Sequence, residues 1–395
     1  MVFFFAAFLL VLQVVAAASL HRRNEPIPPS QDPFYTAPPN FQKAVPGQIL
    51  RARLAPGNLS SIAGAAYALN LLYRTTDSNL APSWAVTTLF VPAKPKKVLL
   101  SYQFPEDSVD IDGAPSYLFY HPGDMPADIN NAVAQGWVVN VPDYEGPFSQ
   151  FTVGIQSGLA TLDSVRAALT LFPVKNYAMW GYSGGTIASE WAAELVSKYA
   201  PELKFSGMAI GGTVANLTAS LETINGGTFA SLVASSLIGL SRQNPAANQF
   251  LMQHLIPATK NQFLAIQQEN FFDAIPNYAG QNIFSYFDND ILHSQPIQQV
   301  ISTNGIMGTH GVPPMQTFFY HAINDELIPI QYTDALVNKY CTAGAKILYK
   351  RNSVGTHLPE AFEEDSDVFQ WLVGVLENGQ TMTGCNIQNV TITGS

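Results

Sequence analysis

Charged side chains are scarce in this sequence. Only 12% of the 395 residues are charged, about half of the roughly 25% that is usual in globular proteins. Acidic residues outnumber basic ones, with 29 Asp and Glu against 19 Lys and Arg, for a formal net charge of −10. This balance excludes the basic surface that a dedicated nucleic-acid-binding protein needs. The surface must be polar mainly through Ser, Thr, Asn, Gln and Tyr.

Cysteine is nearly absent, and the sequence has few long hydrophobic runs. Two cysteines exclude a disulfide-dense scaffold and a cysteine-rich zinc or iron–sulfur site. The lack of long apolar runs beyond the first twenty residues, of repeats and of a heptad period excludes a polytopic membrane protein, a collagen and a coiled coil. Aromatic residues are plentiful, with 24 Phe, 16 Tyr and 5 Trp. Such a chain folds around a sizeable core, as one large domain or two modest ones.

The first residues of the chain are apolar and end in small side chains. Residues 1–20 include no charged residue, and Ala16, Ala17 and Ala18 supply the small residues that a signal peptidase requires. We therefore expect a signal peptide over residues 1–18, cleavage near Ala18, and secretion to the extracellular space. An uncleaved membrane anchor is the alternative, since about 20 apolar residues can span a bilayer.

Two further patterns agree with secretion. Asn58, Asn216 and Asn389 each begin an Asn-X-Ser/Thr triplet, the acceptor pattern for N-glycosylation. Cys341 and Cys385 form an even pair, which is expected to be bridged in an oxidising compartment. Two free buried thiols are the alternative.

The pattern after the first twenty residues predicts an α/β fold. Residues 19–46 are rich in proline and polar residues, which is typical of an extended arm on a protein surface. Apolar, β-branched runs then alternate with helical patterns, so we expect a mostly parallel sheet with helices on both faces, formed by residues 47–213 and 297–395. The expected strands are 85–91, 97–103, 137–141, 177–180, 207–210, 317–321 and 346–349, and the expected helices are 127–135, 158–172, 186–198, 332–341 and 365–376.

Residues 214–296 break this alternation. No confident strand is visible there, and helical apolar patterns follow one another, as in 232–238 and 250–256. A segment of this length is too long for a crossover loop. We interpret it as an inserted helical cap, or lid, over the end of the sheet where a ligand binds in such folds. A second helical layer with no part in the site is the alternative.

The strongest local motif is Gly181-Tyr182-Ser183-Gly184-Gly185. It follows an apolar run and precedes a helical pattern, which is the strand–turn–helix context of a G-x-S-x-G nucleophile elbow. Gly181 and Gly185 provide clearance in a tight turn that exposes the hydroxyl of Ser183. The backbone N–H of Gly184 is then placed to donate to an oxyanion.

A serine nucleophile needs a positioned base, and His357 is the best candidate for it. In elbow-containing folds the chain order is serine, acid, histidine, and His357 lies in a loop after an expected strand and before the last long helix. The other histidines fit less well. His21 and His121 precede the serine, His254 and His293 fall in the cap, His310 lies in a Gly-flanked loop, and His321 is expected to be a satisfied core histidine of a strand.

The acid is expected on the loop after strand 317–321, which points to Asp325. Such an acid holds the imidazole in one tautomer and stabilises the imidazolium. The neighbouring Glu326 is the competing candidate, and Asp334 is a more distant third. A second oxyanion donor should come from the loop after strand 97–103. The sequence has no HGGG-type run there, so another type of loop must supply the donor. The backbone N–H near Asp107 is the candidate, although periodicity alone does not select it.

Together these motifs resemble the fungal secretory lipases of the Candida antarctica lipase A type. The resemblance rests on the elbow, the Ser-Tyr-Gln…Glu-Asp-Ser loop at 101–108, Pro-Asp-Tyr-Glu-Gly at 142–146, His-Ala-Ile-Asn-Asp-Glu-Leu-Ile-Pro at 321–329 and Gly-Thr-His-Leu at 355–358. It covers about residues 33–376. It implies an α/β-hydrolase core with a helical lid, the triad Ser183, Asp325 and His357, and oxyanion donors in the backbones of Asp107 and Gly184. Gly113 is a departure from the family pattern, in which a cysteine is expected at this position.

The resemblance implies a secreted triacylglycerol lipase that cleaves fatty acyl esters through an acyl-enzyme on Ser183. No metal or organic cofactor is needed for this chemistry. The expected partners are an ester or lipid substrate and a lipid–water interface, with neither nucleic acid nor a stable protein partner. A carboxylesterase for short soluble esters is the nearest rival; a serine peptidase and a catalytically dead binding protein are the others.

Overall fold

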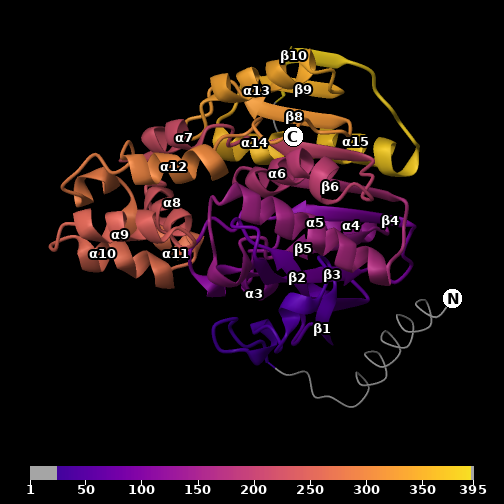
Figure 1. Ribbon diagram of the computed structural model, residues 1–395. Helices are drawn as coiled ribbons and strands as arrows, with labels where there is room; N and C mark the ends of the chain where they lie inside the picture. The colour runs from indigo at the N-terminus through magenta and orange to yellow at the C-terminus, as the bar shows by residue number, and fades with distance from the viewer. Residues whose placement is uncertain (1–24, 393–395) are drawn as a thin grey trace.

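The computed structural model describes residues 25–392 (Figure 1). The expected signal peptide over residues 1–18 and the first residues of the arm at 19–46 lie outside the described residues. Within 25–46 the arm forms two short 3-10 turns, η1 (Pro33–Tyr35) and η2 (Phe41–Lys43). The carbonyl of Tyr35 accepts a hydrogen bond of 2.8 Å from the indole of Trp84, which attaches the arm to the sheet.

One ten-stranded sheet runs through the molecule in the order β1-β2-β3-β5-β4-β6-β7-β8-β9-β10. The strands from β4 onward pair in parallel, whereas β1, β2 and β3 pair antiparallel at one side. The predicted α/β-hydrolase fold with a mostly parallel sheet is thereby confirmed, and every expected strand is present. The strands are β1 (Ile49–Leu54), β2 (Tyr67–Thr76), β3 (Pro82–Val91), β4 (Val98–Gln103), β5 (Val138–Pro142), β6 (Asn176–Tyr182), β7 (Gly207–Gly211), β8 (Thr317–Ala322), β9 (Ile347–Asn352) and β10 (Cys385–Val390).

The register brings the ends of the central strands to one edge. Gln103 at the end of β4 pairs with Gly181 of β6, and Tyr182 pairs with Gly211 at the end of β7. Ala322 at the end of β8 pairs with Asn352 at the end of β9. The loops that leave these strands therefore begin side by side, which is where ligands bind in parallel α/β sheets.

Helices cover both faces of the sheet, each over its own apolar cluster. Helices α5 and α6 pack closely on one face, because Gly158 has no Cβ: one added there would lie 2.7 Å from the backbone of Trp191. Helices α4 and α15 contact the sheet on the other face through Val133, Trp371 and Val375. The helices outside the cap are α2 (Leu59–Ile62), η3 (Ile111–Gly113), α3 (Pro115–Leu118), α4 (Ala127–Ala134), η4 (Gly146–Phe148), α5 (Gly154–Leu171), α6 (Gly184–Tyr199), α13 (Ile330–Thr342), α14 (His357–Glu363) and α15 (Asp365–Glu377).

Between β7 and β8 the chain forms a group of helices that lies beside the sheet, on the left in Figure 1. Its buried apolar residues belong to the same cluster as those of α5 and α6, so the cap and the core share one interior. Gly239 of α8 packs directly on the backbone of Phe151, since a Cβ there would lie 2.3 Å from its carbonyl oxygen. The cap consists of α7 (Leu217–Ile224), α8 (Ser231–Ser241), α9 (Pro245–His254), α10 (Lys260–Ala265), η5 (Ile266–Gln268), α11 (Phe271–Tyr278), η6 (Ile283–Tyr286) and α12 (Gln295–Asn304).

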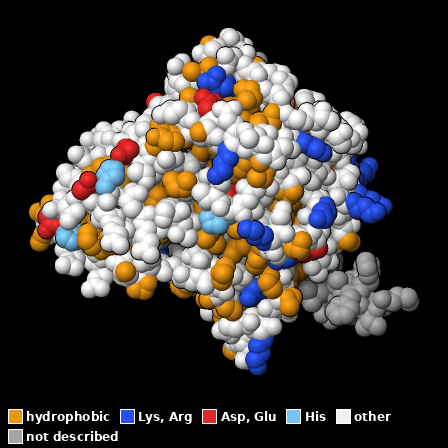
Figure 2. All heavy atoms as spheres, turned by 45° about the horizontal axis from the view of Figure 1, so that its top comes forward, with side chains coloured by type: hydrophobic (Ala, Val, Ile, Leu, Met, Phe, Trp, Pro, Cys, Tyr) orange, Lys and Arg blue, Asp and Glu red, His pale blue; other side chains and the backbone are white. Residues whose placement is uncertain are grey.

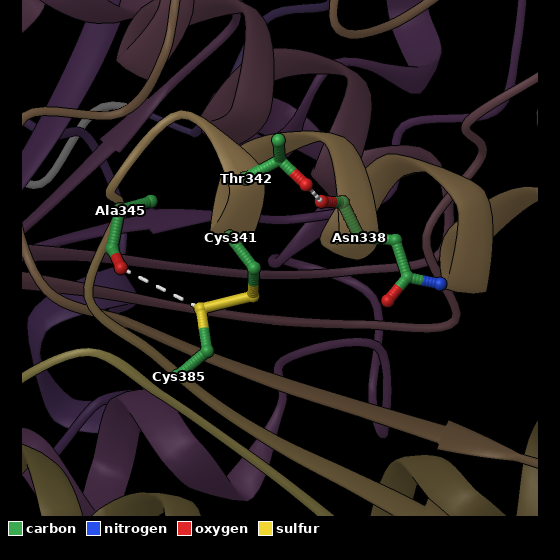
Figure 3. Close-up of a disulfide and its surroundings, with 5 residues drawn as sticks. All are labelled: Asn338, Cys341, Thr342, Ala345 and Cys385. Carbon is green, nitrogen blue, oxygen red and sulfur yellow. Dashed lines mark hydrogen bonds between the residues drawn. A yellow bond between two sulfur atoms is a disulfide. The ribbon is translucent and has the colours of Figure 1, made fainter.

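Cys341 and Cys385 form a disulfide, which confirms the predicted bridge and excludes two free thiols (Figure 3). The bridge joins the end of α13 to the first residue of β10, at a sequence separation of 44. Because β10 is an edge strand and its residues are largely exposed, it has little apolar burial to hold it. The disulfide therefore gives this exposed edge strand a covalent attachment to α13.

The three expected glycosylation sites differ in their surroundings. Asn58 and Asn389 are exposed, whereas the side chain of Asn216 is partly buried and caps α7 by accepting a hydrogen bond of 3.2 Å from the N–H of Ala219. Glycosylation stays a prediction at all three. Over residues 25–392 the structure has no helix that combines the length and apolar character needed to cross a bilayer.

Candidate active site

Ser183 occupies the sharp turn between β6 and α6. Its backbone has φ 50° and ψ −123°, a conformation that L-residues rarely adopt and that functional sites retain at an energetic cost. The turn is possible because its glycines have no side chain. A Cβ on Gly181 would lie 2.6 Å from the carbonyl oxygen of Gly185, and one on Gly185 would lie 2.0 Å from that of Gln103. The hydroxyl of Ser183 is thus presented at the carboxyl edge of the sheet.

His357 faces this hydroxyl. It begins α14 on the loop after β9, it is 1% exposed, and its Nε2 lies 2.8 Å from Oγ of Ser183. The phenolic hydroxyl of Tyr182 donates to the carbonyl of His357 over 2.5 Å. The second residue of the elbow therefore holds the loop that carries the imidazole.

Asp325 completes the hydrogen-bonded chain. Its Oδ2 lies 2.7 Å from Nδ1 of His357, and its Oδ1 accepts from the N–H groups of Leu327 and Ile328 at 2.9 Å and 2.7 Å. Burial alone would raise the pKa of Asp325, but hydrogen bonds from His321 and His357 outweigh burial and hold that pKa well below its usual range. The carboxylate is therefore ionised and anchored at both oxygens.

The competing acids lie elsewhere. Glu326 is exposed, and its carboxylate accepts from the backbone N–H of His357 over 2.9 Å rather than from the imidazole. Asp334 lies on α13, where it pairs with Arg351 at 3.0 Å and accepts from the hydroxyl of Tyr349. Geometry thus favours Asp325 over both as the partner of the imidazole.

The expected oxyanion donors adjoin the serine. Asp107, on the loop after β4, has φ 52°, and its carboxyl group fills the space where a side chain of Gly184 would be. A Cβ on Gly184 would lie 1.8 Å from Oδ1 of Asp107, so only glycine fits at position 184 beside this carboxyl group. Among residues 25–392 we find no acceptor for the backbone N–H of either residue. Within that part of the chain, both N–H groups remain free to bind a negatively charged oxygen.

The carboxyl group of Asp107 was not anticipated from the sequence as a feature of the site. It is 6% exposed, and its Oδ1 has no hydrogen-bond partner among the described residues. Burial raises the pKa of Asp107 to about 7, against an opposing effect of His357. The buried Glu106 precedes it in the loop, and Glu145 lies close enough to interact with it electrostatically. The group is therefore neutral in mildly acidic solution and negatively charged in alkaline solution.

The cap borders the site at the same loop. The hydroxyl of Ser108 donates to the carbonyl of Glu269 over 3.0 Å, just before α11. Within the described part of the chain, no group of three or more His, Cys, Asp or Glu side chains is arranged to hold a metal ion. The assembled groups are a hydroxyl, a base, an anchored acid and two N–H donors, which suit nucleophilic attack on an acyl carbonyl.

The chain is similar to known lipases and esterases over most of its length. Residues 126–384 match the family model described as secretory lipase. The trichothecene C-3 esterase of Fusarium sporotrichioides is 45% identical, over 93% of this chain and 89% of that protein, and lipase A of Arthroderma benhamiae is 35% identical, over 94% and 84%. The crystal structure of Candida antarctica lipase A in its closed state superposes with a TM-score of 0.87 at 28% identity, covering 94% of this chain and 91% of that one.

The geometry predicts that Asp325 acts through His357. Asp325→Asn should lower kcat on an activated ester by about 10⁴-fold, because the imidazole loses the partner that fixes its tautomer. Glu326→Gln should cost far less, and Asp334→Asn should stay within about threefold of wild type. Steady-state kinetics of the three purified variants checks this assignment. A larger loss for Glu326→Gln than for Asp325→Asn would transfer the role to Glu326.

The raised pKa of Asp107 predicts a loss of activity in alkaline solution. Above about pH 7 its carboxylate places a negative charge beside the developing oxyanion, so kcat/KM should fall as the pH rises from about 6 to about 9. Asp107→Asn, which stays neutral, should remove this fall. Asp110→Asn, on the same loop but outside the elbow contact, is the control and should keep it. Coincident pH profiles for wild type and Asp107→Asn would contradict the interpretation.

Proposed function

The chain belongs to the secretory lipase family, and from that premise we propose that it cleaves triacylglycerols and other fatty acyl esters through an acyl-enzyme on Ser183. Lipase or esterase activity follows from the family. The observation that carries the proposed acyl-enzyme is the continuous hydrogen-bonded chain from Ser183 through His357 to Asp325. An intact chain of this kind argues against a dead binding protein on the same scaffold.

Acylation begins when Oγ of Ser183 attacks the ester carbonyl. Nε2 of His357 takes the hydroxyl proton, and the carbonyl electrons move to oxygen, which the N–H groups of Asp107 and Gly184 bind. Collapse of this intermediate breaks the bond to the alcohol, which leaves with the proton from His357. Asp325 stabilises the imidazolium throughout. Water, deprotonated by His357, then releases the fatty acid and restores Ser183.

The surroundings of the site support an apolar acyl group. Phe272 of α11 is 46% exposed and lies three residues from Glu269. Glu269 is the cap residue whose carbonyl accepts from Ser108, on the loop that carries the proposed oxyanion donor Asp107. Leu358, which follows the base His357 directly, is 47% exposed. Burying each methylene group of an acyl chain contributes about 0.8 kcal/mol. Exposed apolar side chains next to the catalytic loops thus favour fatty esters.

A lipid–water interface is the proposed environment of the reaction. Figure 2 shows apolar side chains scattered over the visible face, with Lys and Arg side chains among them. Phe362, on the same short helix as His357, is 76% exposed. We infer that Phe272 and Phe362 insert into the lipid phase while the ester enters the site. Secretion after signal-peptide cleavage near Ala18 would bring the enzyme to such a phase outside the cell.

A second candidate function is hydrolysis of a trichothecene ester at its C-3 position. It rests on the 45% identity with the Fusarium sporotrichioides esterase, over nearly the whole of both chains. The same triad and oxyanion donors would serve it, because the bond broken is again a carboxylic ester. The exposed side chains of Phe272 and Phe362 would then have no part in turnover.

The function is tested with wild type, Ser183→Ala and the control Ser302→Ala on three substrates. These are a triolein emulsion, a soluble short-chain ester and a trichothecene esterified at C-3, with release of acid measured by titration. The lipase proposal predicts release from triolein by wild type and Ser302→Ala, and a loss of at least about 10³-fold for Ser183→Ala, in the range of triad removal. Release confined to the trichothecene ester would establish the second candidate. Release by Ser183→Ala at the wild-type rate would refute the acyl-enzyme.

The interfacial proposal predicts a selective effect of removing apolar side chains. The double variant Phe272→Ser/Phe362→Ser should lose about tenfold or more on the emulsion, since less apolar area enters the lipid. It should keep its rate on the soluble ester. Ile387→Ser, with the same 46% exposure as Phe272 but on the edge strand β10, outside the cap and α14, should change neither rate. Equal losses on both substrates would point to a damaged site instead.

A further inference from the structure

A second histidine contacts the catalytic acid. His321 lies near the end of β8, four residues before Asp325, and both side chains are completely buried. Nε2 of His321 lies 3.1 Å from Oδ2 of Asp325, the same oxygen that lies 2.7 Å from Nδ1 of His357. One carboxylate oxygen thus has an imidazole on each side.

The surroundings of His321 fix where its proton is. Nε2 also lies 3.0 Å from the carbonyl oxygen of Ile328. A carbonyl and an ionised carboxylate only accept hydrogen bonds, so Nε2 must carry the hydrogen, which it shares between them. The other nitrogen, Nδ1, has no partner within the described chain.

Asp325 is therefore saturated with donors. Oδ1 accepts from the N–H groups of Leu327 and Ile328, and Oδ2 accepts from His321 and His357. The N–H groups of Leu327, Ile328 and His321 hold the carboxylate in place, and the fourth donor is the proposed base, His357. A carboxylate with four donors is oriented without freedom to turn away from His357.

We propose that His321 is a positioning residue for the catalytic acid, whose Nε2–H aims Oδ2 of Asp325 at His357 and moderates its pull on the imidazole, so that the working unit is the chain Ser183–His357–Asp325–His321. This inference rests on the proposed function, because it assigns His321 a task within that triad.

A role only in packing explains the site less well. A leucine or phenylalanine would fill the same volume without leaving a buried nitrogen unpartnered among the described residues, which is costly. The imidazole of His321 instead directs its Nε2–H at the carboxylate of Asp325. The loop from Ala322 to Ile328 is also closed by this histidine, because the same N–H reaches the carbonyl of Ile328 at its far end.

The proposal has a consequence for the pH dependence of catalysis. Without the donor from His321, Oδ2 has one donor fewer, accepts more strongly from His357 and stabilises the imidazolium form. The other titratable groups near Asp325 and His357 are Glu326, Glu360, Tyr182 and Asp107. Burial raises the pKa of Glu360 to about 8 and raises that of Tyr182 well above its usual range. The variants at position 321 described below leave all of these groups in place.

The test compares two amides of equal polarity at position 321. The amide nitrogen of Gln reaches the position of Nε2 in a histidine, whereas that of Asn falls short of it. We expect His321→Asn and His321→Leu to lower kcat on a soluble ester by about tenfold or more, with KM within about twofold, and to move the acidic limb of the kcat/KM profile to higher pH. His321→Gln should retain most of the rate and the wild-type limb.

Controls separate this inference from the proposed function. His254→Gln, in the cap, should behave as wild type, and thermal unfolding of every variant is measured alongside. If His321→Leu prevents folding, the His321→Gln and His321→Asn pair decides alone. Equal rates and limbs for these two variants, both folded, would overturn the inference while leaving the triad standing. An inactive wild type, or an active Ser183→Ala, would instead refute the proposed function.

Discussion

The strained turn at Ser183 is the constraint on which the rest of the site depends. A non-glycine residue holds φ 50° there because the structure on both sides leaves it no alternative. Gly181, Gly184 and Gly185 are each approached so closely that a Cβ would collide with Gly185, Asp107 or Gln103 respectively. The elbow thus packs directly against the end of β4 and the loop that follows it. Its geometry places the nucleophile, both candidate oxyanion donors and the start of α6 together.

The parallel sheet brings the other residues of the candidate site next to this turn. Because β4, β6, β8 and β9 end at one edge, the segments that carry Asp107, Ser183, Asp325 and His357 leave the sheet side by side. Short contacts then fix the loops to one another, such as the hydroxyl of Tyr182 on the carbonyl of His357. The cap joins at the same edge through Ser108 and Glu269. This hydrogen bond joins the cap directly to the loop that carries Asp107.

Much of this arrangement could be predicted from the sequence, because the elbow and the chain order of the fold are local signals. They identified Ser183, Asp325 and His357, which the structure brings within hydrogen-bond distance. Strands β1, β2 and β10 were not anticipated, since the antiparallel pair precedes the alternating pattern and β10 is an exposed edge strand. His321 was expected to be an ordinary core residue, because its contact with Asp325 depends on how the loop after β8 folds back. The same holds for the carboxyl group of Asp107, whose contact with Gly184 joins two distant segments.

The most direct test of the account is a crystal structure of the protein after reaction with an alkyl phosphonate ester. The phosphorus should be bonded to Oγ of Ser183, and the phosphoryl oxygen should lie about 2.7–3.1 Å from the backbone nitrogens of Asp107 and Gly184. Nε2 of His357 should face the ester oxygen, with Asp325 unmoved behind it. Phosphonate bonded to another residue, or a phosphoryl oxygen turned away from both nitrogens, would contradict the account.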